Sequence, residues 1–145
     1  MKKPILIIER YDGIYKKAVN LLAEKLKEKG CPKVTVHDLA RTDMAEAVED
    51  AFRYSRLVVA AASYDSDVFP PMHDFLHHLA IKNFSKRRIG IIENGSWAPC
   101  AGRVMRGMLE QMKDVEIVEP MVTILSRMKQ SDRAALEALA DAILK

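Results

Sequence analysis

The stretch from Ser63 to Asp67 holds the residues of this 145-residue chain best suited to ligand binding. Its sequence, SYDSD, places hydroxyl and carboxylate groups directly after the apolar run Leu57–Ala62. That run is short and has no polar alternation, which is typical of a strand buried on both faces of a parallel sheet. In open α/β sheets, ligands bind in the crevice outside the carboxyl ends of the strands. The sequence therefore predicts a ligand-binding loop here, followed by a helix that begins near Pro71.

Two other groups of residues suggest different chemistry. His73 and His77 are four residues apart, so they would share one face of a helix, as paired metal ligands do. No Glu follows His73 to form the HExxH pattern, and a solvated helix face is the favoured interpretation. Cys100 begins a predicted helix, a position that can activate a thiol, but no Cys or His is close to it in sequence. We expect Cys100 to be a small buried residue and expect no metal site.

The signatures of covalent and hydrolytic enzymes are absent from the sequence. It contains no Ser-His-Asp series, no paired catalytic carboxylates, and neither the GxGxxG nor the GxxxxGK[ST] pattern. We therefore expect no self-contained catalytic site, and whether the chain forms part of an enzyme stays open. Electron transfer requires none of these signatures because a bound cofactor performs the chemistry.

Composition and charge exclude several classes of protein. Hydrophobic residues make up 49% of the chain and charged residues 30%, as in ordinary globular proteins, and the length predicts a single domain over residues 1–145. No apolar run approaches the roughly 20 residues of a membrane span. The first apolar run is too short for a signal peptide, so we expect a cytoplasmic protein, either an excised domain or a small stand-alone one. The net charge is +3 and the basic cluster Ile81–Gly90 is small, so nucleic acid is not expected as a partner.

Short apolar runs and amphipathic stretches alternate along the whole chain. The predicted strands cover residues 4–8, 34–37, 57–62, 88–92 and 115–118, and the last resumes at 121–125. The predicted helices cover residues 14–29, 44–54, 71–81, 98–114 and 132–145, with Asp43 and Ser131 as the N-caps of the second and the last. This alternation predicts an α/β fold, a three-layer sandwich whose five-stranded parallel sheet has the order 2-1-3-4-5 and helices on both faces. The loops after Glu9, Ala62 and Ile92 would then meet at one edge.

Two of these loops resemble motifs of a known family. Residues 63–71, SYDSDVFPP, stand where that family typically has TYNGGVFPP, and residues 93–101, ENGSWAPCA, are similar to its GSYGWSGGA. On these motifs the chain resembles the flavodoxin-like domain of the A-type flavoproteins, also called flavodiiron proteins, over almost its whole length. The resemblance implies a flavodoxin-like fold with the strand order predicted above.

The same resemblance implies FMN as the cofactor, with its phosphate in the first loop and its ring between the second and third. Tyr64 and Trp97 would supply aromatic faces for the ring, and N–H and hydroxyl groups at a helix N-terminus would bind the phosphate. It also implies electron transfer to an attached diiron domain or another redox partner protein, for reduction of oxygen or nitric oxide, and a homodimer. The cofactor-binding residues implied are Arg10, Tyr11, Gly13, Ile14, Tyr15, Ser63, Tyr64, Asp65, Ser66, Asp67, Val68, Asn94, Gly95, Ser96, Trp97 and Cys100.

The first loop departs from the family pattern. Residues 10–15, RYDGIY, stand where the family typically has SMYGNT, so that only Gly13 is shared. Asp12 brings a negative charge toward a phosphate dianion, whereas Arg10 offers a charge-assisted partner. An alternative hypothesis is therefore a degenerate flavodoxin-like module without FMN, which acts in protein association or small-ligand binding.

Substitution of Trp97 by Ala tests the resemblance at its second motif. If the indole stacks on the flavin ring, the Trp97→Ala variant will bind FMN more weakly by roughly 0.5–1.5 kcal/mol beyond the loss of contact area. Quenching of FMN fluorescence measures the dissociation constant. An unchanged constant would remove Trp97 from the site.

Overall fold

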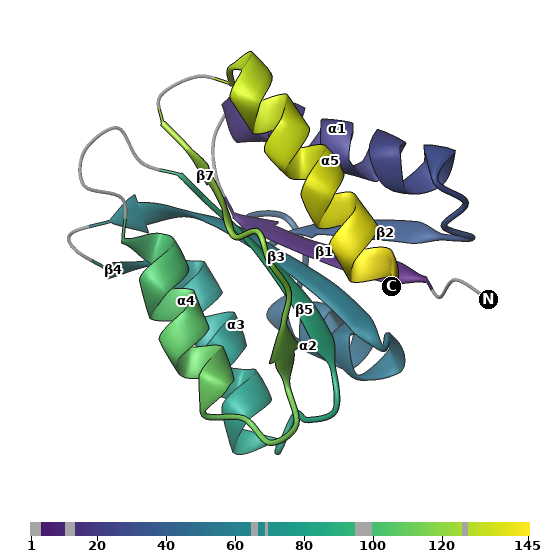
Figure 1. The fold of residues 1–145 in the computed structure, drawn as a ribbon. Coiled ribbons are helices and arrows are strands. Elements are labelled where there is room, and N and C mark those ends of the chain that lie inside the picture. The colour runs from purple at the N-terminus through teal and green to yellow at the C-terminus, as the bar shows by residue number, and fades with distance from the viewer. Residues whose placement is uncertain (1–3, 11–13, 65–66, 69, 95–99, 126–127) are drawn as a thin grey trace.

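A computed structural model describes residues 4–10, 14–64, 67–68, 70–94, 100–125 and 128–145 of the chain (Figure 1). At residues 9–10, 14–16, 63–64 and 67–68 it describes the backbone alone. Strands and helices alternate along these residues, as the sequence predicts. The elements are β1 (Ile5–Arg10), α1 (Ile14–Glu28), β2 (Val34–Asp38), α2 (Met44–Arg53), β3 (Arg56–Tyr64), β4 (Asp67–Val68), α3 (Pro70–Ile81), β5 (Arg88–Asn94), α4 (Ala101–Glu110), β6 (Glu116–Ile117), β7 (Val122–Ile124) and α5 (Gln130–Leu144).

The sheet has the predicted strand order. Its hydrogen-bonded path runs β2-β1-β3-β5-β6, and β7 pairs with β5 beyond the end of β6. Both β6 and β7 run parallel to β5, so together they form the fifth strand in two pieces. This confirms the predicted order 2-1-3-4-5 and the predicted interruption of the last strand. The sequence analysis did not anticipate β4, which pairs antiparallel with the end of β3.

The interruption of the fifth strand has a simple cause in the register. Ile117 pairs with Ile89 and Val122 pairs with Ile92, so the fifth strand advances five residues while β5 advances three. The two extra residues cannot both join the ladder. Pro120 lies between the two pieces and has no N–H to donate. The chain therefore leaves the sheet after β6 and returns to it at β7.

Helices cover both faces of the sheet, with α1 and α5 on one face and α2, α3 and α4 on the other (Figure 1). Alternate residues of β1 divide between the two layers: Leu6 and Ile8 contact the α2–α3–α4 side, and Ile5 and Ile7 contact the α1–α5 side. Because both faces are covered, a central strand needs apolar residues at every position. This explains the uninterrupted apolar runs in the sequence.

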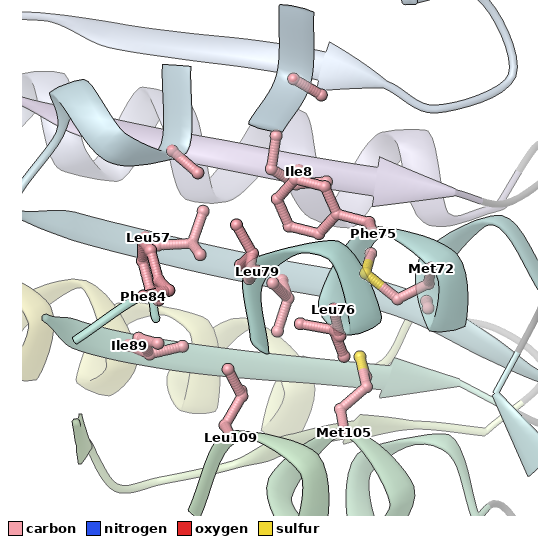
Figure 2. Close-up of a cluster of buried hydrophobic side chains, with 14 of the residues drawn as sticks. Ile8, Leu57, Met72, Phe75, Leu76, Leu79, Phe84, Ile89, Met105 and Leu109 are labelled. Atoms are coloured by element: carbon pink, nitrogen blue, oxygen red, sulfur yellow. The ribbon is translucent and has the colours of Figure 1, made fainter. Parts of the chain in front are cut away.

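The larger core lies between the sheet and α3 and α4. Figure 2 shows Ile8, Leu57 and Ile89 of the strands facing side chains of these two helices. All of the labelled residues are buried. The labelled residues of α3 and α4 are Met72, Phe75, Leu76, Leu79, Met105 and Leu109, and Ala47, Val48 and Ala51 of α2 belong to the same cluster. Helix α3 follows the predicted ligand-binding loop in sequence and packs against β3, the strand that precedes this loop.

The predicted bounds of two helices are wrong. The last helix begins at Gln130, and its N-cap is Lys129 rather than Ser131, because the Asp132 carboxylate accepts a hydrogen bond from the Lys129 backbone N–H at 2.7 Å. Helix α4 begins at Ala101, later than predicted, and ends at Glu110, earlier than predicted. Asp114, the predicted last residue of this helix, has a φ of 56° and lies in a turn. Asp43 is confirmed as the N-cap of α2, where it accepts from the Ala45 N–H. No described helix is long and apolar enough to cross a membrane.

A pair of substitutions on α3 tests this packing. Leu76 is fully buried and Ile81 on the same helix is 60% exposed. We expect Leu76→Ala to lower the free energy of unfolding by about 2–5 kcal/mol, since it removes buried methyl groups and leaves a cavity. The control Ile81→Ala should change it by about 0.5 kcal/mol or less. Urea denaturation followed by circular dichroism measures both, and equal effects would contradict the described core.

Candidate functional site

The three central strands end at the same level of the sheet. Arg10, the last residue of β1, pairs with Ala61 of β3, and Asn94, the last residue of β5, pairs with Ala62. The loops that follow these strands in sequence therefore leave the sheet from one edge. At the tip of β3, Tyr64 pairs with Asp67 in a short antiparallel ladder. This is the carboxyl edge at which the sequence predicts ligand binding.

The backbone brings the described members of the predicted site to this edge. Arg10 ends β1, Ile14 and Tyr15 begin α1, and Ser63 and Tyr64 end β3. Asp67 and Val68 form β4. The side chains of Asn94 at the end of β5 and Cys100 immediately before α4 are both buried. The remaining predicted residues lie outside those described; they are Tyr11, Gly13, Asp65, Ser66, Gly95, Ser96 and Trp97.

A buried carboxylate lies at the same edge, on the residue that begins the second loop motif. Glu93 is only 5% exposed, and each of its carboxylate oxygens accepts one hydrogen bond. Oε1 accepts from the backbone N–H of Gly102 at 2.9 Å, and Oε2 accepts from the Thr123 hydroxyl at 2.6 Å. The side chain thereby joins β5 to the first turn of α4 and to β7. These bonds offset the cost of burying a charged group.

Gly102 permits this arrangement because it has no side chain. A Cβ atom at this position would lie 2.8 Å from Cδ of Glu93 and 2.7 Å from Sδ of Met121. Both separations are shorter than van der Waals contact, so any larger residue must displace its neighbours. The sequence does contain a signal for this contact. Glu93 directly follows the apolar run of β5, and Gly102 stands in the first turn of the next helix. Neither Gly102 nor Thr123 was recognised from the sequence.

Asn94 lies on the other face of the sheet. Successive residues of a strand point to opposite faces, and Ile92 packs in the α1–α5 layer, so the Asn94 side chain belongs to that layer. The side chain is 7% exposed. A buried amide has both donors and an acceptor to satisfy. Its position at the end of β5, on the carboxyl edge of the sheet, makes Asn94 a candidate for contact with a polar ligand.

Helices α2 and α3 border a separate groove of about 690 Å³, lined by Met44, Val48, Phe52, His78 and Lys82 among others. It contains none of the predicted site residues. The imidazole of His73, which the sequence analysis weighed as a metal ligand together with His77, is exposed, as is that of His77. Among the described residues no group of three or more His, Cys, Asp or Glu side chains is placed to hold a metal ion.

The architecture was compared with known proteins. No match was found among protein-family models or among curated proteins. Solved structures do match: rubredoxin:oxygen oxidoreductase from Desulfovibrio gigas is similar to 99% of this chain, with a TM-score of 0.89 and 14% identity. A flavodoxin from the domain Archaea is similar to 97% of it, with a TM-score of 0.81 and 14% identity. The chain has the flavodoxin-like fold.

A third similar structure is a variant of the flavo di-iron protein from Thermotoga maritima, which matches 99% of this flavodoxin-like chain with a TM-score of 0.79 and 19% identity. The chain spans 35% of the Desulfovibrio oxidoreductase and 36% of the Thermotoga protein, but 96% of the archaeal flavodoxin. The flavodoxin-like fold expected from the two loop motifs is thus confirmed.

Two glycines of α4 provide a matched test of the Glu93 contact. We expect Gly102→Ala to destabilise the protein by about 1–3 kcal/mol, because its Cβ overlaps the Glu93 carboxyl group and Met121. Gly107→Ala in the same helix meets nothing within 4 Å and should stabilise it by about 0.4–1 kcal/mol. Thermal and urea denaturation measure both. Equal stabilisation by the two alanines would contradict the close packing at Gly102.

Proposed function

We propose that this chain is a cytoplasmic FMN-binding electron-transfer domain of the flavodiiron type. The observation that carries the proposal is that the parallel pairings of β1, β3 and β5 end at a common level, so the connections after these strands start from one edge of the sheet. The similarity of the fold to flavodoxins and to flavodiiron proteins supports it. The motifs at residues 63–71 and 93–101 support the choice of ligand.

The donors at this edge fit the chemistry of FMN. The first turn of α1 contains no acidic residue, and Lys16 and Lys17 follow Tyr15, so the positive end of the helix dipole suits a phosphate dianion. The buried Asn94 amide offers donors and an acceptor for the polar edge of a flavin ring. A phosphate at α1 and a ring near the ends of β3 and β5 are therefore compatible with the described residues.

FMN supplies the electron-carrying chemistry when it is bound, and the protein supplies orientation and electrostatics. With FMN bound, the backbone N–H groups at the start of α1 would hold the phosphate, and Tyr64 and Trp97 would supply aromatic faces for the ring. Asn94 would hydrogen-bond the polar edge of the ring. Asp12, Asp65, Asp67 and Glu93 would add negative charge around the ring, which would disfavour an anionic reduced flavin and lower its reduction potential.

The proposed electron acceptor is a diiron centre in an attached domain or a separate redox protein. The chain spans about a third of the two matching proteins whose names describe an oxygen oxidoreductase and a flavo di-iron protein. We propose that the rest of such a protein, or a partner that replaces it, reduces oxygen or nitric oxide. A homodimer belongs to the same proposal.

Titration with FMN tests the proposed cofactor. Purified protein should show flavin absorbance in the visible range, or the apoprotein should quench FMN fluorescence at micromolar concentrations with one site per chain. A colourless protein that does not respond to FMN would contradict the proposal and favour the module without a cofactor.

An amide substitution tests the proposed role of Asn94. We expect Asn94→Ala to weaken FMN binding by about 2- to 12-fold, which corresponds to the 0.5–1.5 kcal/mol of one net hydrogen bond. Gln111→Ala is the control, because it removes an exposed amide just after the carboxyl end of α4. Fluorescence quenching measures both constants. Equal affinity of the Asn94 variant and the wild type would exclude the amide from the site.

A further inference from the structure

We propose that the groove between α2 and α3 belongs to the contact surface of a twofold-symmetric homodimer, in which α2 of each copy packs against α3 of the other. The function proposed above includes a homodimer without placing its interface, and this inference rests on that part of it. The groove of about 690 Å³ contains none of the predicted cofactor-binding residues, so the contact does not depend on FMN.

The charged residues that line this groove are sorted by helix. Among the described lining residues, the acids are Asp43, the N-cap of α2, and Glu49. The bases are His78 and Lys82, on α3 and directly after its last residue. Glu49 pairs with Arg53 of its own helix, and no ion pair in the described part of the chain connects the two walls. One wall is therefore acidic, the other is basic, and their charges can meet a second molecule.

The rest of the two helices has the same polarity. Residues 43–53 hold Asp43, Glu46, Glu49 and Asp50 against a single basic residue. The only acid of α3, Asp74, does not line the groove. Helix α2 thus carries net negative charge, and the groove side of α3 carries none.

Twofold symmetry makes this polarity self-complementary. Because α2 and α3 each connect two parallel strands, both helices run from the carboxyl edge of the sheet back to its amino edge, and they pack side by side. A twofold axis parallel to the helices places each acidic wall against a basic wall, twice in one dimer. An axis across the helices would place α2 against α2, acid against acid, which is unfavourable. The charges therefore select the first arrangement.

An aromatic side chain supplies an apolar anchor for the contact. Phe52 lines the groove and is 37% exposed, and Met44 and Val48 continue its stripe at four-residue spacing. The Phe52 ring lies edge-on to the buried Phe84, with 5.2 Å between ring centroids. Its carbonyl oxygen accepts from Nη2 of Arg87 at 3.0 Å. Phe52 is thus held in place before a partner binds, which favours a strong contribution to binding.

The first test measures association of the purified protein. Analytical ultracentrifugation should show a reversible dimer whose dissociation constant rises as salt is raised from about 0.05 to about 0.5 M, because ions screen contacts between acids and bases. A chain that stays monomeric up to about 1 mM would overturn the proposal and leave the groove to a small molecule or a different protein.

Charge reversal tests the arrangement of the helices. Glu49→Lys makes both walls basic and Lys82→Glu makes both walls acidic, so each variant alone should dissociate at least about tenfold more readily than the wild type. In an equimolar mixture unlike walls meet again. The two variants should then form a heterodimer with a dissociation constant within about threefold of the wild-type value. A mixture that does not associate would contradict the packing of α2 against α3.

Two reversals on α1 are the controls. Glu24 and Lys27 are exposed on the opposite face of the sheet, and Glu24→Lys and Lys27→Glu make the same changes in net charge. They should leave the dissociation constant within about twofold of the wild-type value. If they weaken the dimer as much as the groove variants do, net charge explains the effect and the proposed interface is wrong.

Phe52→Ala tests the apolar anchor and should raise the dissociation constant of the dimer by at least about tenfold. The control is Val36→Ala. Val36 is 41% exposed and pairs with Ile7, whose side chain packs in the α1–α5 layer, so it faces away from α2 and α3. Val36→Ala should change the constant by less than about twofold, and circular dichroism checks that both variants fold. Equal effects would contradict the anchor.

Titration with FMN separates this inference from the proposed cofactor. Lys82→Glu should bind FMN as the wild type does, because Lys82 is not among the predicted cofactor-binding residues. A monomer that binds FMN would overturn the interface and leave the electron-transfer function in place. A dimer that follows the charge reversals and binds no FMN would support the interface, and the FMN-binding function alone would fail.

Discussion

The structure depends on the burial of its three central strands, β1, β3 and β5, on both faces. A strand in this position must be apolar at every residue, and its backbone groups must all find partners in neighbouring strands. Ile5–Ile8 and Leu57–Ala61 meet the first condition, and the parallel pairings on either side meet the second. The burial requirement ends where the helices cease to cover the sheet. Polar residues can therefore stand at the strand ends, where they are able to contact a ligand.

The edge that results is built on elements that the core holds in place. The strand ends and the starts of α1 and α4 are fixed by the sheet and its two helical layers, and several of the residues proposed to contact FMN belong to them. Glu93 is the exception to the separation of apolar core and polar edge. It carries a carboxylate one residue inside the end of β5 and satisfies it with the first turn of α4 and with β7. This one polar contact therefore ties together three elements around the proposed site.

Much of the fold could be predicted from the sequence. The apolar runs, the amphipathic helices and their alternation gave the strand order, the two helical layers and the common edge for the three loops. The two loop motifs gave the flavodoxin-like fold by resemblance. Helix ends were less predictable, because competing caps differ by little energy: Ser131 has a good N-cap side chain, yet the Asp132 carboxylate reaches back to the Lys129 amide and starts the helix earlier.

The sequence by itself determined which strands are buried and which residues follow them. Burial on two faces requires an uninterrupted apolar run, and such a run can be recognised without knowing which elements pack against the strand. Only the tertiary structure decided what Glu93 contacts. Its two donors lie nine and thirty positions away, on elements whose approach depends on how α4 and the interrupted fifth strand pack against β5. Such hydrogen bonds form only when donor and acceptor atoms of residues distant in sequence come within about 3 Å of each other. Packing fixes that separation, and residue type alone does not.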